Sequence, residues 1–219
     1  MSGTSTPPAA TAGSAAGTAD RNAETGGPTF IRAFANSLTP QTCEDIIARF
    51  EADSRKGPSS TATRDKPLIR SGTMLHISQY PEWQDVVAIY QAALDRNLRA
   101  YAQSFPSLNE LLQPSVSFRS PPLMERIEPM QGFGMHVDAT VASTHMRTVA
   151  ALLYLRDIDG GGATEFPFQQ VKLQPKAGTM VLFPPFWTHP HRGASPKSGI
   201  KYNLTSFLVI RDDWRPPNT

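Results

Sequence analysis

Residues 148–183, TVAALLYLRDIDGGGATEFPFQQVKLQPKAGTMVLF, decide the fold class of this chain of 219 residues. They begin with a nearly continuous apolar run, which is typical of a central strand that is covered on both faces. Turns rich in glycine and proline then separate three shorter segments of strand composition, TEFPF, VKLQP and TMVLF. Short strands and turns at this spacing predict a β-rich region.

The same pattern continues on both sides of this stretch. Upstream, SVSFR, LMERIE and FGMHVD have strand composition, and downstream FWTHPHR and KYNLTSFLVI do so. About eight or nine strands separated in this way are typical of a double-stranded β-helix, or jelly roll. We therefore expect residues 115–212 to form a jelly-roll core.

Helical periodicity is confined to the preceding residues, 28–114. Thr39 and Pro40 suit the N-cap and the first position of a helix. In that helix one face would carry Cys43, Ile46, Ile47 and Phe50. A second helix is predicted over residues 81–104, where large apolar side chains recur every three or four residues. We expect both helices to pack on one sheet of the jelly roll, as a support region of the same domain.

Residues 1–27 consist mostly of Ala, Gly, Ser, Thr and Pro. Such a segment cannot bury enough apolar surface to offset the entropy of ordering it, so we predict a disordered tail. It lacks the basic start and apolar centre of a secretory signal.

The overall charge and hydropathy indicate which partners to expect. The formal net charge is only +2, so nothing favours nucleic acid or a membrane surface as partner. No apolar run approaches the roughly 18 residues of a membrane helix. Cys43 is the single cysteine, which rules out an internal disulfide and fits a reducing compartment. We expect a cytoplasmic protein.

The segment GMHVDA holds the first candidate for chemistry. His136 and Asp138 are two residues apart, so on a strand both side chains point the same way and can grip one metal ion. A third ligand would come from FWTHPHR, where His189 and His191 are both candidates. Two histidines and one carboxylate on one face of a metal leave open positions, an arrangement typical of non-haem Fe(II) oxygenases.

These residues resemble a known family, the Fe(II)/2-oxoglutarate dioxygenases, and in particular their prolyl 4-hydroxylase-like branch. That family's pattern is H-x-D followed by a distant histidine, with a glycine two residues later and a lysine ten residues later. His191 meets the pattern with Gly193 and Lys201, whereas His189 would put a glycine in the lysine position. The resemblance therefore implies that His136, Asp138 and His191 are the metal ligands and the catalytic centre.

The resemblance also nominates residues around the metal. It implies that Lys201 binds the far carboxylate of 2-oxoglutarate, although the position alone would also suit an exposed strand start. RTVAALLYLRDIDGGGATEFP resembles the family's strand, glycine turn and T-x-F segment, which implies that Tyr154, Thr164 and Phe166 line the co-substrate pocket. One position departs from the family: Ile127 lies near the place of a tyrosine that binds the co-substrate, with Arg126 beside it.

Three further residues lie near these motifs. Trp187, His189 and His191 alternate in sequence, so we expect them to lie along one strand with His189 facing the same pocket. His145 falls in the polar loop after Asp138, where we expect a lid or surface residue. Arg147 opens the central strand and could bind a substrate carboxylate or form a plain ion pair.

The resemblance implies an oxygenase that hydroxylates an unactivated carbon. It would use Fe(II), 2-oxoglutarate and O₂, release succinate and CO₂, and be stimulated by ascorbate. Asp138 favours hydroxylation, because related halogenating enzymes carry a small residue in its place. The substrate stays open between an amino acid, a peptidyl (prolyl-like) residue and a natural product, so the expected partner is a small molecule or a peptide.

Two other functions remain open at this point. A zinc-dependent hydrolase could use the same His/Asp/His set, but it would need a general base and would have no use for Lys201. A non-catalytic jelly-roll protein that binds a metal or ligand is the second alternative. The oligomeric state is open as well.

Overall fold

A computed structural model describes Met1 and residues 29–59, 70–139 and 146–214. Its strands are β1 (Arg32–Phe34), β2 (Gly57–Pro58), β3 (Thr73–Leu75), β4 (Ser117–Arg119), β5 (Leu123–Ile127), β6 (Phe133–His136), β7 (Arg147–Tyr154), β8 (Thr164–Phe166), β9 (Val171–Leu173), β10 (Met180–Phe183), β11 (His191–Gly193) and β12 (Lys201–Ile210). Its helices are α1 (Pro40–Ala52), α2 (Gln84–Ser104), α3 (Leu108–Leu111) and the 3₁₀ turns η1 (Ile77–Gln79) and η2 (Pro81–Trp83).

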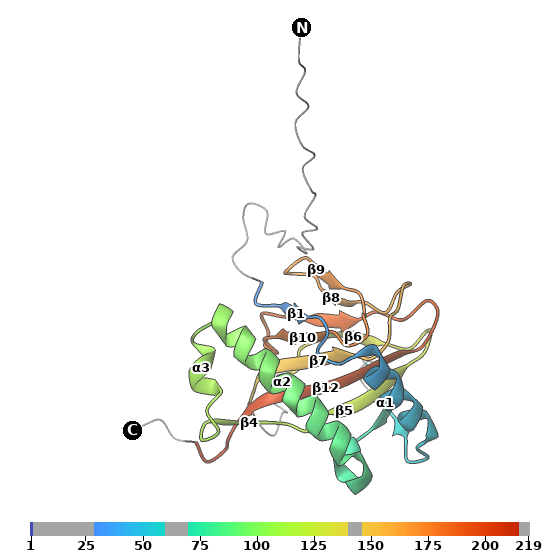
Figure 1. Cartoon of the computed structure of the whole chain (residues 1–219), viewed down its shortest axis with the longest axis horizontal. Coiled ribbons are helices and arrows are strands. Elements are labelled where there is room, and N and C mark those ends of the chain that lie inside the picture. The colour runs from blue at the N-terminus through green and yellow to red at the C-terminus, as the bar shows by residue number, and fades with distance from the viewer. Residues whose placement is uncertain (2–28, 60–69, 140–145, 215–219) are drawn as a thin grey trace, which may run out of the picture.

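The strands form two antiparallel sheets. The eight-stranded sheet has the order β1-β10-β7-β12-β5-β3-β2, with β4 also on β12, and the four-stranded sheet has the order β6-β11-β8-β9. In Figure 1, α1 and α2 lie across the outer face of the larger sheet, while β8 and β9 belong to the other layer. The predicted mainly-β jelly roll with helices on one sheet is confirmed.

The apolar run that opens the quoted stretch is a central strand, as its composition predicts. Strand β7 pairs with β10 on one side and with β12 on the other. Every strand-like segment after residue 115 forms a strand in the expected order, from β4 to β12. One prediction was wrong: the strand over FWTHPHR starts only at His191, and Trp187 lies in an exposed turn before it.

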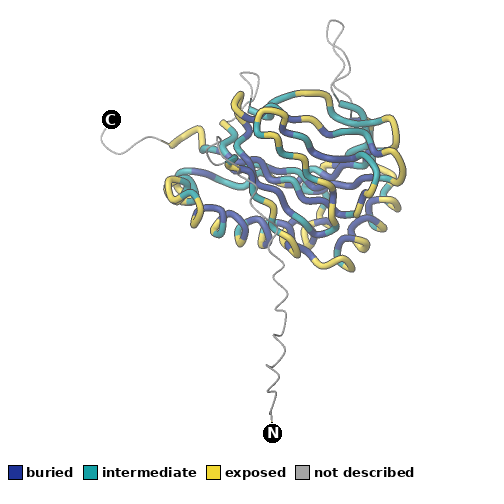
Figure 2. The backbone as a smooth tube through the Cα atoms, turned by 90° about the horizontal axis from the view of Figure 1, so that it is seen from above, coloured by how far each residue is buried: buried dark blue, intermediate teal, exposed yellow. Residues whose placement is uncertain are grey.

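The two predicted helices pack through the expected faces. The Thr39 side chain caps α1 by accepting a hydrogen bond from the Thr42 backbone nitrogen. Its buried face consists of Cys43, Ile46, Ile47 and Phe50. The second helix begins as the turn η2 at Pro81 and continues as α2. Figure 2 shows both helices with their buried residues turned toward the sheets and their exposed residues turned away.

The side chains of strand β12 alternate between the two faces of the larger sheet. Its even-numbered side chains point to the helices: Tyr202 donates a hydrogen bond to Glu51 of α1, and Ser206 bonds Tyr90 of α2. Odd-numbered side chains, beginning with Lys201, therefore point between the two sheets. Arg126 on β5 faces the helical side, where it forms ion pairs with Glu51 and Glu128.

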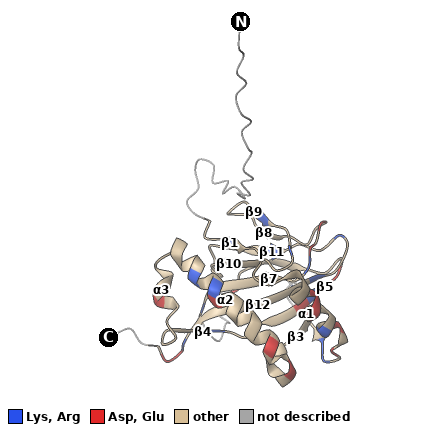
Figure 3. Ribbon diagram, viewed as in Figure 1, with Lys and Arg blue, Asp and Glu red and all other residues tan. Residues whose placement is uncertain are grey.

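Charged residues are scattered over the surface. Figure 3 shows positions of basic and of acidic residues along both α1 and α2. No helix in the described ranges combines the length and apolar character needed to cross a membrane. The predicted tail, residues 1–27, lies outside the described residues except for Met1. The proposed boundaries at 28, 115 and 212 stay predictions.

Candidate metal centre

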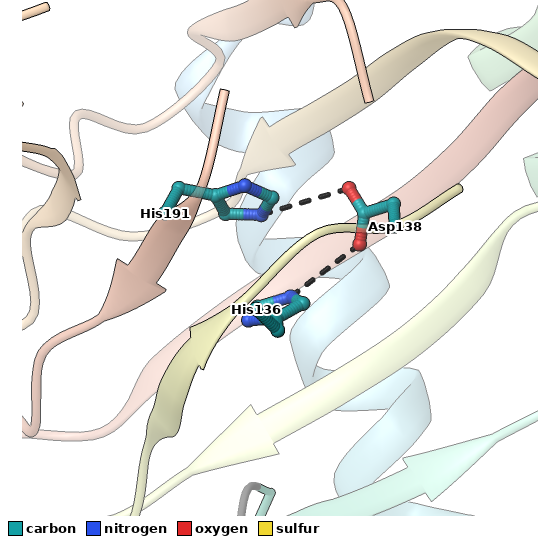
Figure 4. A group of neighbouring side chains, drawn as sticks. All are labelled: His136, Asp138 and His191. Carbon is teal, nitrogen blue, oxygen red and sulfur yellow. Dashed lines mark ion pairs between the residues drawn. The ribbon is translucent and has the colours of Figure 1, made fainter. Parts of the chain in front are cut away.

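Two neighbouring strands of the smaller sheet bring the candidate ligands together. His136 ends β6 and His191 begins β11, and their Cα atoms are direct partners in the antiparallel register. The two imidazole centroids are 4.4 Å apart. Asp138 follows β6, with its Oδ1 3.4 Å from His136 Nε2 and its Oδ2 3.6 Å from His191 Nε2 (Figure 4).

These three side chains can share one cation. One ligand atom from each lies within 4.8 Å of the others, and the described part of the chain contains no other group of three such residues. Gly193 permits this approach, because a Cβ there would lie only 2.8 Å from the Phe133 side chain. The register thus explains why glycine follows His191 by two residues.

Backbone carbonyls orient both imidazoles. His136 Nδ1 lies 2.8 Å from the Gly134 carbonyl oxygen, and His191 Nδ1 lies 3.1 Å from the His189 carbonyl oxygen. A proton on each Nδ1 donates to its carbonyl, which leaves both Nε2 atoms facing Asp138. Such outer contacts select the tautomer that a metal requires.

The backbone holds Asp138 in place as well. Its amide nitrogen and that of Ala139 both donate to the Pro185 carbonyl, at 3.1 and 3.0 Å. Arg147 donates to the Asp138 carbonyl at 2.9 Å, and its guanidinium lies over the Phe207 ring at 4.0 Å. Arg147 therefore supports the ligand segment.

The ionisation of the site suits a cation. Burial raises the pKa of Asp138, but the hydrogen bond to His136 and the charges of both histidines outweigh it and lower that pKa. Burial lowers the pKa of His191. For His136, burial opposes protonation, but the bond to Asp138 raises the pKa. A proton on His136 Nε2 thus occupies the position that a metal ion would take.

Lys201 is buried on the opposite wall, in the larger sheet. It is 1 % exposed, and burial lowers the pKa of its ammonium to about 8. Its Nζ donates to the Gly162 carbonyl at 2.8 Å and lies 5.3 Å from the Tyr154 ring centroid. Gly162 has a φ of +68°, a conformation that favours glycine, so the glycine turn presents this carbonyl. An ammonium has three donors, so it can still bind an anion.

The other nominated residues lie in the same interior. Tyr154 donates to the Thr164 hydroxyl at 2.7 Å, which connects the two sheets. The Phe166 ring lies 5.3 Å from the His191 ring, and Phe183 lies 4.9 Å from it. Phe166 thus packs beside His191, while Tyr154 and Thr164 share the interior with Lys201. Their contact with a co-substrate stays a prediction.

His189 does not face the site, contrary to the expectation. Its Nε2 lies 2.9 Å from the Thr29 carbonyl and its Nδ1 lies 2.9 Å from the Thr188 hydroxyl. The reason is that the His189 amide donates to the Phe186 carbonyl at 2.8 Å and closes a turn over residues 186–189, so the alternation of a strand does not apply to them. His145 lies outside the described residues.

Sequence reasoning missed several supporting groups. The carbonyls of Gly134, Pro185 and His189 orient the ligands, but a backbone atom leaves no signal in the residue type. The sequence indicated Phe183 only as a residue of an apolar strand and not as a neighbour of His191. Ile127 does face inward, directly opposite Lys201 in the register of β5 and β12, so no tyrosine hydroxyl is available there.

A jelly roll that joins two histidines and one carboxylate on adjacent strands belongs to the class of non-haem iron oxygenase folds. Residues 123–209 match the family model described as the 2OG-Fe(II) oxygenase superfamily. This part of the chain is thus similar to the superfamily, which supports the resemblance and the expected enzyme class, an oxygenase. Fe(II) and 2-oxoglutarate are the cofactor and co-substrate that this family name implies. No curated protein matches the sequence.

Solved structures share the fold at low sequence identity. A viral collagen prolyl hydroxylase from Paramecium Bursaria Chlorella virus-1, in complex with 2OG, has a TM-score of 0.61 at 18% identity, covering 83% of this chain and 97% of its own. A prolyl-4-hydroxylase from Pseudomonas putida has a TM-score of 0.54 at 19% identity, covering 84% and 94%. A prolyl hydroxylase from Trichoplax adhaerens, in complex with a hypoxia inducible factor peptide, has 0.65 at 16%, covering 83% and 84%.

Proposed function

We propose that this protein is an Fe(II)- and 2-oxoglutarate-dependent hydroxylase that adds a hydroxyl group to an unactivated carbon. One observation carries the proposal: a His/Asp/His group whose Nε2 atoms both face the carboxylate lies in the same interior as a buried lysine. The balanced reaction consumes the substrate C–H, O₂ and 2-oxoglutarate, and it yields C–OH, succinate and CO₂. Prolyl residues in peptides are the first substrate class to test, because the similar structures are prolyl hydroxylases.

The donor set fits the metal that the family implies. His136 and His191 would bind it through Nε2 and Asp138 through a carboxylate oxygen, and the remaining coordination positions would be open to ligands. When bound, Fe(II) supplies the activation of O₂ and the oxidative decarboxylation of 2-oxoglutarate. The carbonyls on the two Nδ1 atoms hold the imidazoles in the metal-binding orientation throughout.

The surrounding residues would bind the co-substrate and exclude water. Lys201 would pair with the far carboxylate, since an ammonium buried in low dielectric gains most from an anionic partner. Tyr154 and Thr164 would lie beside that carboxylate, and Phe166 would keep water from His191. These side chains act by binding and orienting, so they would set the affinity for 2-oxoglutarate.

The test is turnover of the purified full chain with Fe(II), ascorbate and 2-oxoglutarate. Succinate would be quantified while proline-containing peptides and free amino acids are screened by mass spectrometry for a gain of one oxygen. We expect succinate release with one substrate class and none for the Asp138→Ala variant. Ascorbate would be omitted in a parallel reaction, where we expect turnover to decline over repeated cycles.

Other outcomes would favour the alternatives. Retention of Zn(II) with no binding of 2-oxoglutarate would overturn the proposal in favour of a zinc hydrolase. Tight binding of 2-oxoglutarate with no succinate release under any substrate would favour a non-catalytic binding protein.

A further inference from the structure

Asn203 holds a buried amide whose oxygen has no hydrogen-bond partner. The residue is 2 % exposed, and its Oδ1 forms no hydrogen bond. Buried polar groups in native proteins are almost always hydrogen-bonded, so a buried amide oxygen without a partner calls for a ligand or a water. The two ends of an amide have the same shape, and a 180° rotation would present Nδ2, a donor, at the same place.

The position of Asn203 points to 2-oxoglutarate as that ligand. Asn203 is the next inward-facing residue of β12 after Lys201, and its Cα is the direct partner of Tyr154 on β7. Two positions further along, the inward face reaches Thr205, and then Phe207, which packs under Arg147. Arg147 in turn binds the carbonyl of Asp138. The inward face of β12 therefore leads from Lys201 toward the metal ligands, with Asn203 between them.

The neighbouring polar group does not satisfy this amide. Glu125 is the Cα partner of Asn203 on β5, but its carboxylate pairs with Arg70 and accepts the Thr205 hydroxyl at 3.1 Å. On the other side, Ile127 occupies the place of the family's tyrosine and offers no polar atom. A molecule that lies along this wall beyond Lys201 would therefore meet the unpaired amide oxygen of Asn203.

We propose that Asn203 donates a hydrogen bond to 2-oxoglutarate at the end of the molecule nearer the metal, replacing the tyrosine hydroxyl that Ile127 removes. This inference rests on the proposed function and adds a binding residue to it. Lys201 holds the far carboxylate, and Asn203 fixes how the rest of the co-substrate lies. With the amide rotated, Nδ2 would lie at the position where Oδ1 has no partner, and the co-substrate would accept its hydrogen bond.

Asn203→Leu tests the proposal, because leucine has nearly the shape of asparagine and no polar atom. The dissociation constant for 2-oxoglutarate would be measured by calorimetry on the full chain with Mn(II), which binds without oxidative turnover. We expect it to rise roughly tenfold or more, as for the loss of a hydrogen bond to a charged group. The melting temperature of the ligand-free variant should rise, since the unpaired amide is gone. Ile127→Tyr in the Asn203→Leu background should restore part of the affinity.

Asn97→Leu is the matched control. Asn97 is also buried, on α2, but its Nδ2 donates to the Ser37 hydroxyl at 2.8 Å. Its substitution should lower the melting temperature and leave the affinity for 2-oxoglutarate unchanged. Lys201→Ala should weaken binding whether or not the proposal holds, which shows that the assay responds.

An affinity of Asn203→Leu within about twofold of the wild type would overturn the proposal, because a hydrogen bond to a charged group has a larger effect. A lower melting temperature with unchanged affinity would also overturn it and assign Asn203 a structural role. If Asn203→Leu fails to fold, Asn203→Ala is measured with the same expected loss of affinity. A wild type that binds Mn(II) but no 2-oxoglutarate would instead refute the proposed function itself.

Discussion

The two sheets of the jelly roll differ in what they carry. The eight-stranded sheet and the helices enclose the larger core cluster, in which residues such as Phe50, Leu153 and Leu204 are fully buried. The four-stranded sheet has strands of only three or four residues, yet it carries His136 and His191. Stability and metal binding are therefore assigned largely to different sheets.

The larger sheet nevertheless also contributes side chains to the interior between the two sheets. Lys201, Tyr154 and Asn203 come from the larger sheet, on the face turned away from the helices. Long strands paired on both sides hold a side chain more rigidly than short edge strands do. In the proposed function the larger sheet would supply a fixed wall for the co-substrate, while the smaller sheet would supply the two histidine ligands. Substitutions in each sheet test this division.

The largest expected effect is that of His191→Ala on metal binding. One of three ligand atoms is lost, so bound metal and turnover should both disappear while the fold persists. Metal content after purification and the melting temperature would be measured together. The matched variant is Leu153→Ala, in the core of the larger sheet, which should lose about 2–5 kcal/mol of stability. Its folded fraction should still bind metal.

Two results would contradict this division of stability and metal binding between the sheets. If His191→Ala unfolds the chain, the smaller sheet depends on the ligand residue for stability. If Leu153→Ala abolishes metal binding in protein that is demonstrably folded, the two sheets do not act separately.

The next effect concerns the wall formed by the larger sheet. Lys201→Met should raise the KM for 2-oxoglutarate at least tenfold, because the buried cation beside the glycine turn is removed. The kcat at saturating co-substrate should change much less. Methionine also relieves the burial of an ammonium with a single acceptor, so the ligand-free variant should melt at a higher temperature. An unchanged KM would exclude Lys201 from co-substrate binding.

Much of this arrangement could be predicted from the sequence, because it depends on local patterns. The apolar run of β7, the N-cap of α1 and the H-x-D spacing each reflect one short stretch of chain. The choice of His191 over His189 needed the family pattern, since both residues fit a strand at that spacing. The structure adds the reason that Gly193 must lack a Cβ next to Phe133.

The missed features depend on contacts between distant segments. Nothing in FWTHPHR indicates that Trp187 and His189 lie in a turn, because the turn is held by contacts such as that of His189 with Thr29. The unpaired amide oxygen of Asn203 lies beside Glu125, which pairs with Arg70, a residue 55 positions before Glu125 in the chain. Such pairings appear only when the tertiary structure is known.

The pH dependence of co-substrate binding is the third prediction. Burial lowers the pKa of Lys201 to about 8, so above that pH the ligand-free protein loses the charge and must take up a proton to bind a carboxylate. The affinity for 2-oxoglutarate should therefore fall, by up to about tenfold per pH unit, as the pH rises beyond this value. Calorimetry over this range would measure it, and Lys201→Met should have a flatter profile.

The lowered pKa of Lys201 also determines how the stability of the ligand-free protein changes with pH. Between the lowered folded-state pKa and the ordinary value of 10.5, the unfolded chain binds more protons than the folded chain. This lysine therefore makes the ligand-free protein more stable as the pH rises through that interval. Over this interval the unfolding free energy of the wild type should rise with pH relative to that of Lys201→Met. Identical dependence in both would contradict the assignment.

The smallest effect is expected for His189→Ala, which removes the His189 ring and keeps its backbone carbonyl. The His189 side chain bonds Thr29 and Thr188, whereas its carbonyl orients His191. Removal of the ring should cost about 1 kcal/mol of stability through the lost hydrogen bonds and leave metal affinity within about twofold of the wild type. Metal titration of His189→Ala beside His191→Ala is the direct measurement. If His189→Ala loses the metal and His191→Ala keeps it, then the ligand assignment is wrong and the carbonyl contact has no role in orienting a ligand.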